Sequence, residues 1–194
     1  SKKEEVSKSI NKVVSQFGGI DILISNSGSA FQGQMKDLDE KILKTSMSNN
    51  FYSHHYIIQE TVKIMINQSF GGSISINLSK QSINPGNNFG PYGIAKASAL
   101  FMMKQYALEC GKHNIRVNGV NADRIQSGLL TKEMITQRAK SRGIKEGDYL
   151  KNNLLNKEVT AEDVAESFYV QLSLNKTTAN IITVDGGNIE ASLR

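Results

Sequence analysis

The sequence has 194 residues and a net charge of +5, with 39% hydrophobic and 21% charged residues. This composition is typical of a globular chain, and we expect a single domain over residues 1–194. No apolar run reaches the length of about 18 residues that a membrane span needs, and the scattered basic residues form no tract suited to nucleic acid. Because Cys110 is the only cysteine, an internal disulfide is excluded and a reducing cytoplasm is the expected location.

The first half of the chain reads as a helix, a strand and a long helix. Residues 4–17 carry apolar side chains at helical spacing and predict an amphipathic helix that ends at Gly18. Residues 20–25 form a short apolar run, typical of a strand buried on both faces. A helical pattern over residues 38–68 follows and is interrupted at Asn49 and Asn50, which are mediocre helix formers.

The second half of the chain alternates strands with helices. Residues 73–77 and 115–120 are predicted strands, and a helix over residues 92–111 lies between them. Residues 160–163 predict a capped helix start, and residues 181–184 a last strand. This alternation predicts a parallel sheet with helices on its faces, in which ligands bind beyond the carboxyl ends of the strands.

Tyr92 and Lys96 are candidates for proton-transfer chemistry. They lie four residues apart in a predicted helix, so both project from one face. A free tyrosine, with a pKa of about 10, is a poor base, and an ammonium one turn away is expected to lower that pKa. Ser79, beyond the preceding strand, is placed to hold a substrate oxygen. The Tyr–Lys spacing alone is weak, because such pairs arise by chance and are more often simple surface pairs.

The wider context resembles the short-chain dehydrogenase/reductase family. The matching segments, in order, are Asp21-Ile-Leu-Ile-Ser-Asn-Ser-Gly28, Asn50, the set Ser79, Tyr92 and Lys96, Ile115-Arg-Val-Asn118, and Val184-Asp-Gly-Gly187. The resemblance implies a Rossmann-like doubly wound parallel sheet and an oxidoreductase that transfers hydride between NAD or NADP and an alcohol or aldehyde. It assigns catalytic roles to Asn50, Ser79, Tyr92 and Lys96.

The resemblance also implies cofactor contacts and an assembly. Contacts to the cofactor are expected from Asn26, Gly28, Tyr92, Lys96, Ile125 and Ser127. Where the family has Pro-Gly before Ile125, this chain has Ala122-Asp123, which changes the path of the loop. In the family the helices that carry Asn50 and Tyr92 pair across a dimer. A homo-oligomer is therefore expected, and dimer and tetramer both stay open, as do NAD and NADP.

The family's opening Gly-rich turn, Thr-Gly-x-x-x-Gly-x-Gly, is not present in this sequence. We therefore expect that about two leading βα units, roughly 60 residues, belong to a longer polypeptide. The predicted strand at residues 20–25 would then be an exposed apolar edge. The alternative to an active dehydrogenase is a catalytically silent binding or assembly module.

Three segments resemble the dehydrogenase part of fused rhamnulose-1-phosphate aldolase/short-chain dehydrogenases. They are Asn84-Pro-Gly86, the run from Val120 to Leu130, and Asp185-Gly-Gly-Asn-Ile189. This resemblance implies oxidation of lactaldehyde in rhamnose catabolism and an aldolase domain fused upstream.

Two further features invite functional interpretations. His54 and His55 are adjacent, but zinc needs more ligands in register, so we expect packing or surface roles and no metal. Residues 131–157 are polar and occupy the place of the family's mobile substrate lid. Their basic residues, Arg138, Arg142 and Lys145, fit an exposed helix face better than an anion site.

Overall fold

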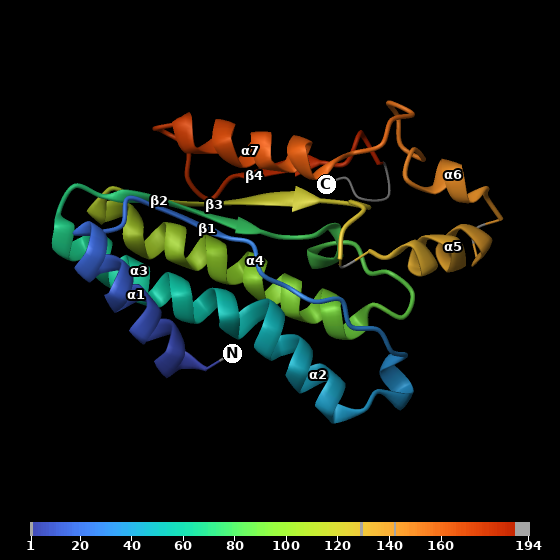
Figure 1. Ribbon diagram of the computed structural model, residues 1–194, viewed down its shortest axis with the longest axis horizontal. Helices are drawn as coiled ribbons and strands as arrows, with labels where there is room; N and C mark the ends of the chain where they lie inside the picture. Colours follow the sequence, from blue (N-terminus) through green and yellow to red (C-terminus); the bar gives the residue numbers. More distant parts are fainter. Residues whose placement is uncertain (1, 129, 142, 189–194) are drawn as a thin grey trace.

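The protein was analysed as a computed structural model, which describes residues 2–128, 130–141 and 143–188. Within them a four-stranded sheet has the order β1-β2-β3-β4, and each neighbouring pair is parallel. The strands are Ile22–Ser25 (β1), Gly72–Asn77 (β2), Ile115–Ala122 (β3) and Ile181–Val184 (β4). Helices lie on both faces of the sheet (Figure 1), so the predicted doubly wound parallel sheet is confirmed.

The helices form two layers and an outlying group. One face of the sheet carries α1 (Lys3–Phe17), α3 (Ser53–Gln68) and α4 (Gly90–Cys110), with α2 (Glu40–Met47) joined to α3 by a π-helical turn, Ser48–Tyr52. The other face carries α7 (Ala161–Ser173). Beyond the carboxyl ends of the strands lie α5 (Lys132–Ser141) and α6 (Glu146–Tyr149) (Figure 1).

The helix ends follow local sequence signals. Gly18 ends α1 with φ of 86°, where its N–H donates to the carbonyl of Val14; a residue with a Cβ is strained in this left-handed conformation. Thr160 and Asp163 form a reciprocal capping box at the start of α7. Both predicted boundaries are confirmed.

The main core lies between the sheet and the helices α3 and α4. It is built from aliphatic side chains that are fully buried, among them Ile58, Met65, Ile74, Ile76, Met103, Ile115 and Val117. Burying each such side chain contributes roughly 1.5–3 kcal/mol to stability. A smaller cluster of Val120, Val164 and Phe168 joins α7 to β3. These two clusters hold the carboxyl ends of β2 and β3 in place.

The edge strand β1 differs from its prediction. Leu23 and Ser25 are buried, but Ile22 and Ile24 are 51% and 45% exposed. The helix α7 packs over β2, β3 and β4, so the described residues leave that face of β1 uncovered. The prediction of burial on both faces is therefore wrong, and the predicted exposed apolar edge is confirmed.

Candidate active site

The candidate residues gather where the parallel strands end. Ser79 follows β2 and is the N-cap of the short helix η3 (Lys80–Ser82). Tyr92 lies in the first turn of α4, and Lys96 follows it one turn later. Both side chains are buried, which a surface Tyr–Lys pair would not be. The geometry therefore favours the functional interpretation of the spacing.

Ser79 and Tyr92 share a hydrogen bond between their side chains. The Ser79 Oγ also accepts from the backbone N–H of Gln81 at 3.3 Å, which fixes its position. Burial raises the pKa of Tyr92, the hydrogen bond with Ser79 lowers it, and the carboxylate of Asp123 raises it, with a raised pKa as the net result. The two hydroxyl groups thus form a buried, directed pair in which the phenol is protonated at neutral pH.

Lys96 does not act on Tyr92 as predicted. Its ammonium donates to the carbonyl of Asn77 at 2.8 Å and lies 5.8 Å from the centre of the Tyr92 ring. Burial lowers the pKa of Lys96 to about 8, so the amine stays mostly protonated at neutral pH and begins to lose its proton just above it. The predicted lowering of the Tyr92 pKa by Lys96 is wrong, because Lys96 is not among the groups that shift this pKa and burial of the phenol raises it.

Asn50 sits in the π-helical turn between α2 and α3 and is fully buried. Its Nδ2 donates to the carbonyls of Ser29 at 2.9 Å and Ser46 at 3.1 Å, and its Oδ1 accepts from the N–H of Ser29 at 3.0 Å. A π-turn redirects one side chain relative to a regular helix, and such turns are frequent at functional sites. Here the turn aims Asn50 at the loop that follows β1.

That loop brings Asn26 and Gly28 close to Lys96. A Cβ at Gly28 would lie 2.9 Å from the Oδ1 of Asn50 and 3.7 Å from the Nζ of Lys96, so only glycine leaves this approach open. The Oδ1 of Asn26 accepts from the Nδ2 of Asn77 at 2.6 Å. The loop therefore presents backbone, amides and an ammonium together, which suits a ligand rich in hydroxyl groups.

Ile125 and Ser127 lie farther along, on the loop after β3. Ile125 packs against the cluster around Val120 on the α7 side, and Ser127 is exposed. Two members of the expected segments, Leu129 and Ile189, lie outside the described residues, as does Arg142 of the expected lid.

The sequence did not predict three polar features near the site. Asn121 is buried, and both polar atoms of its side chain lack a partner among the described residues. Asp123 lies 3.0 Å from the Nζ of Lys80. His54, expected to pack or lie at the surface, is fully buried with its Nδ1 2.6 Å from the Oγ of Ser25. The one available signal was the Ala122-Asp123 pair in place of Pro-Gly.

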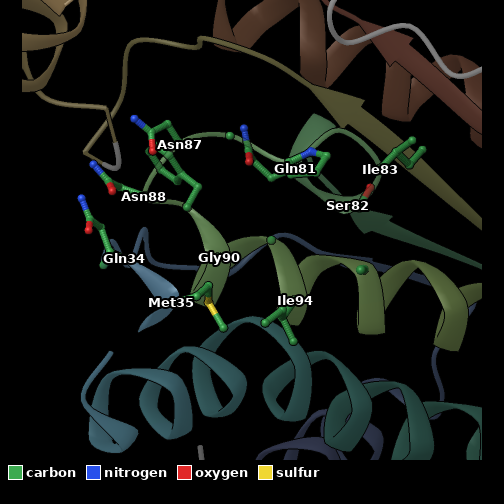
Figure 2. Close-up of a pocket in the computed structure, with 15 residues that line it drawn as sticks. Gln34, Met35, Gln81, Ser82, Ile83, Asn87, Asn88, Gly90 and Ile94 are labelled. Atoms are coloured by element: carbon green, nitrogen blue, oxygen red, sulfur yellow. The ribbon is translucent and has the colours of Figure 1, made fainter. Parts of the chain in front are cut away.

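A cavity of about 480 Å³ lies beside the site. It is enclosed by the segment 33–35, the loop 81–90 and the first turns of α4 (Figure 2). Four amide side chains line it together with apolar groups: Gln34, Gln81, Asn87 and Asn88. The ring of Phe89 joins it to Tyr92, with centroids 6.3 Å apart. Since none of the described lining residues is charged, the cavity suits an uncharged polar ligand.

Two searches of the described residues bear on other kinds of function. They contain no group of three or more histidine, cysteine, aspartate or glutamate side chains arranged to hold a metal ion. None of the described helices is both long enough and apolar enough to span a bilayer.

Comparison with known proteins decides the family. Residues 1–188 match the family model described as Enoyl-(Acyl carrier protein) reductase, of the short-chain dehydrogenase/reductase type. The chain belongs to the short-chain dehydrogenase/reductase family. This short-chain dehydrogenase/reductase chain is 31% identical over 195 residues to the uncharacterized oxidoreductase YuxG of Bacillus subtilis (strain 168), covering 96% of this chain and 28% of YuxG. It is 33% identical over 118 residues to dehydrogenase/reductase SDR family member 4 of Bos taurus, covering 60% of this chain and 42% of that protein.

Solved structures of the family have the same fold. Carveol dehydrogenase from Mycobacterium avium, in complex with NAD, superimposes with a TM-score of 0.88 at 20% identity, covering 96% of this chain and 71% of that one. ElxO with NADP bound gives a TM-score of 0.83 at 23% identity, with 96% and 74% coverage. This short-chain dehydrogenase/reductase chain thus spans less than half the length of the two curated relatives named above.

Proposed function

We propose that the chain carries the proton-transfer site of an NAD(P)-dependent oxidoreductase that acts on an alcohol or aldehyde substrate by hydride transfer. The observation that supports this most is the buried hydrogen bond between Ser79 and Tyr92, with Lys96 one helical turn away. A purely structural role would not require two adjoining buried hydroxyl groups beyond the ends of parallel strands. Membership of the short-chain dehydrogenase/reductase family supports the same chemistry.

The proposed proton path runs through these side chains. The substrate oxygen takes a hydrogen bond from Ser79 and a second from Tyr92. In reduction the protonated phenol donates its proton to the oxygen, and in oxidation the phenolate accepts it. Because burial raises the pKa of Tyr92, the resting site is prepared for reduction, and oxidation should speed up as the pH rises above neutrality.

Lys96 and Asn50 hold this path in place. The Lys96 ammonium, with its pKa lowered to about 8, can return a proton to Tyr92 near neutral pH. The carbonyl of Asn77 orients it through a 2.8 Å hydrogen bond. Asn50 holds the loop after β1 through Ser29, which keeps the space beside Gly28 open.

The residues present fit the nicotinamide end of a dinucleotide. The opening beside Gly28 is bordered by Asn26, Asn50 and Lys96, whose amides and ammonium match ribose hydroxyl and carboxamide groups. Ile125 and Ser127 are assigned to the same end of the cofactor. When bound, the nicotinamide supplies the hydride chemistry. NAD and NADP are both retained as candidates, as the carveol dehydrogenase and ElxO structures carry one each.

For the substrate we propose lactaldehyde, oxidised as part of rhamnose catabolism by a longer polypeptide with an upstream aldolase domain. Lactaldehyde would react as its hydrate, which carries the hydroxyl proton that Tyr92 accepts and becomes lactic acid, and the nicotinamide, when bound, would take the hydride. The coverage of only 28% of YuxG supports a longer polypeptide, and so does the exposed apolar edge of β1. The uncharged lining of the cavity beside Tyr92 is compatible with a neutral hydroxyaldehyde. A cytoplasmic location is supported by the lone, buried Cys110.

The test is a turnover assay on the full-length polypeptide with lactaldehyde and either NAD⁺ or NADP⁺. We expect reduction of the cofactor to follow lactaldehyde concentration with saturation, and Ser79→Ala to lower kcat by roughly 10- to 100-fold through loss of one oriented hydrogen bond. Ser15→Ala, on the exposed face of α1, is the matched control and should leave kcat unchanged.

The outcomes separate the proposals. Turnover of an unrelated alcohol without any turnover of lactaldehyde would overturn the substrate and keep the reaction type. No turnover with any alcohol or aldehyde, by a folded protein that binds NADH, would favour the catalytically silent module.

We also propose that two copies of the chain pair through α3 and α4. A groove of about 830 Å³ between these helices is lined by apolar and aromatic groups, including Phe51, Val62 and Met102. Phe101, which lines the groove, is 71% exposed, and Leu108 on the same helix is 79% exposed. The buried Oε1 of Gln59, in the same groove, lacks a partner among the described residues. Apolar surface of this extent is typical of an interface between subunits.

Phe101→Glu should convert the oligomer into smaller species. A carboxylate placed in an apolar interface loses its hydration, and burying it costs several kcal/mol. Sedimentation velocity at matched concentrations measures the effect. Phe70→Glu is the control, because Phe70 is 62% exposed and follows the end of α3, away from the groove. An unchanged sedimentation coefficient for Phe101→Glu would overturn this interface.

A further inference from the structure

A buried cluster of charge lies beside the Ser79–Tyr92 pair and takes no part in the proton path above. The Oδ2 of Asp123 is 3.0 Å from the Nζ of Lys80, 2.7 Å from the Nδ2 of Asn188 and 3.5 Å from the Nε of Arg124. The side chains of Lys80 and Asp123 are only 11% and 10% exposed. Asp123 therefore connects its own loop after β3 to the turn after β2 and to the segment after β4, which are distant in the sequence.

Each of these segments borders the proposed site. Lys80 directly follows Ser79, so its ion pair ties the η3 turn to the end of β3. Asn188 ties down the segment that follows β4. Arg124 continues toward α6, where it donates to the carbonyls of Tyr149 at 3.4 Å and Asn152 at 3.0 Å. The cluster thus holds the Ser79 turn, the strand ends and α6 in one arrangement.

The backbone conformation of Arg124 belongs to the same charged cluster. Its φ is 56°, a left-handed conformation that is strained for a non-glycine residue. The guanidinium lies 5.2 Å from the centre of the Tyr149 ring. The strained backbone is retained because the ion pair and the two carbonyl bonds fix Arg124 in place.

Stability alone does not account for a buried charge at this position. Replacing a buried ion pair with apolar residues of similar volume is often neutral or stabilising, because the desolvation of two charges offsets their attraction. Asp123 also stands where the family has a glycine in its Pro-Gly pair. A buried charge at this position, beside the Ser79 turn, points to a role in the neighbouring site.

Several charged or titratable groups lie around the site, on different elements. Lys96 on α4 is directed at the carbonyl of Asn77. Lys80 on η3 and Arg124 after β3 both point at Asp123. His54 on α3 is uncharged at neutral pH, since burial lowers its pKa to about 3. Asp123 is thus the negative charge, among the described residues, that acts on the phenol.

We propose that Asp123 is a positioning residue of this site: through Lys80 it fixes the turn that carries Ser79, and it places a negative charge beside the Tyr92 hydroxyl. The inference rests on the proposed function for its consequence in catalysis. Its physical content, the charge beside the phenol, does not depend on any substrate or cofactor. Asp123 and Lys80 should therefore change the titration of Tyr92 in opposite directions.

The experiment follows the Tyr92 ring by NMR in the 194-residue chain labelled with ¹³Cζ-tyrosine. The Tyr92 signal is assigned by its absence in Tyr92→Phe. In Asp123→Asn, which keeps the shape and the acceptor oxygen, the titration midpoint of Tyr92 should move to lower pH by roughly 0.5–1. In Lys80→Met, which removes the nearer of the two cations beside Asp123, the midpoint should move to higher pH.

Opposite movements distinguish this role from a purely structural one, because loosened packing would move both variants in the same direction. An unmoved midpoint in Asp123→Asn, or equal movements in both variants, would overturn the proposal. If either variant does not fold, the direction in which the Tyr92 midpoint moves in the other variant still tests the proposal. Glu40→Gln removes the exposed ion pair with Lys44 (2.8 Å) on α2 and serves as the control that should leave the Tyr92 signal unchanged.

The same variants separate this inference from the proposed function. In the full-length polypeptide, Asp123→Asn should lower kcat for carbonyl reduction by at least fivefold and leave KM within twofold. A moved midpoint without any dehydrogenase activity in the parent protein would sustain the positioning role and overturn the enzyme proposal. If the parent protein has dehydrogenase activity and the Tyr92 midpoint does not move in Asp123→Asn, the enzyme proposal is sustained and the positioning role is overturned.

Discussion

Tyr92→Phe should lower kcat of the full-length polypeptide by about 10²- to 10⁴-fold, the usual contribution of a positioned acid/base group. The substitution removes the proton that Tyr92 exchanges with the substrate oxygen. It retains the buried ring beside Phe89, so the fold should lose only the hydrogen bond with Ser79, worth about 1 kcal/mol. The measurement is the lactaldehyde turnover assay described above, paired with thermal unfolding of the same sample.

Tyr169→Phe is the matched control for this change. Tyr169 lies on α7 and is 76% exposed, so its hydroxyl should not affect kcat. Activity of Tyr92→Phe within twofold of the parent would count decisively against Tyr92 as the acid/base group. A large loss of activity together with a large loss of thermal stability would show that the substitution damaged the fold, and Ser79→Ala would then carry the test.

The second large effect concerns His54 and the stability of the chain in acid. Burial lowers the pKa of His54 to about 3, with a smaller contribution from the charge of Lys96. In the unfolded chain the pKa returns to about 6.5, so below that pH the unfolded state binds a proton that the folded state does not. The contribution to stability is therefore complete above pH 6.5 and is lost as the pH falls toward 3.

The expected loss is roughly 1.4 kcal/mol per pH unit, or about 3 kcal/mol between pH 6.5 and 4.5. Urea unfolding at a series of pH values measures it. In His54→Gln, which can still reach Ser25, this part of the pH dependence should disappear. His113→Gln replaces a half-buried histidine at the end of η4 (Gly111–His113) and should retain the dependence. Identical pH dependence in the parent and in His54→Gln would contradict the burial of an uncharged His54.

Several parts of the fold and the site could be read from local pattern. The spacing of apolar residues predicted the helices and strands along the chain, Gly18 marked the end of α1, and Thr160 marked the start of α7. Tyr92 and Lys96 were expected on one helix face, where the structure has them. Such features depend on residues within one or two turns of each other, so the local sequence pattern predicts them without any knowledge of the fold.

Other features depended on contacts between distant elements. The exposure of Ile22 and Ile24 follows from how far α7 extends across the sheet, which no local pattern records. The raised pKa of Tyr92 follows from its burial, although the helix spacing pointed to a lowered one. The pairing of His54 with Ser25 joined two elements whose relative placement the pattern did not reveal.

The sequence by itself determined which side chains share a strand end or a helix face, because the geometry of a regular element relates neighbours in the chain. The tertiary structure alone decided which of them are buried and which charges they meet. Asp123 illustrates the difference: its place after a predicted strand was readable, whereas its ion pair with Lys80 required β2 and β3 to lie side by side. Burial and charge set the chemistry of Tyr92, and both come from packing between elements far apart in the chain.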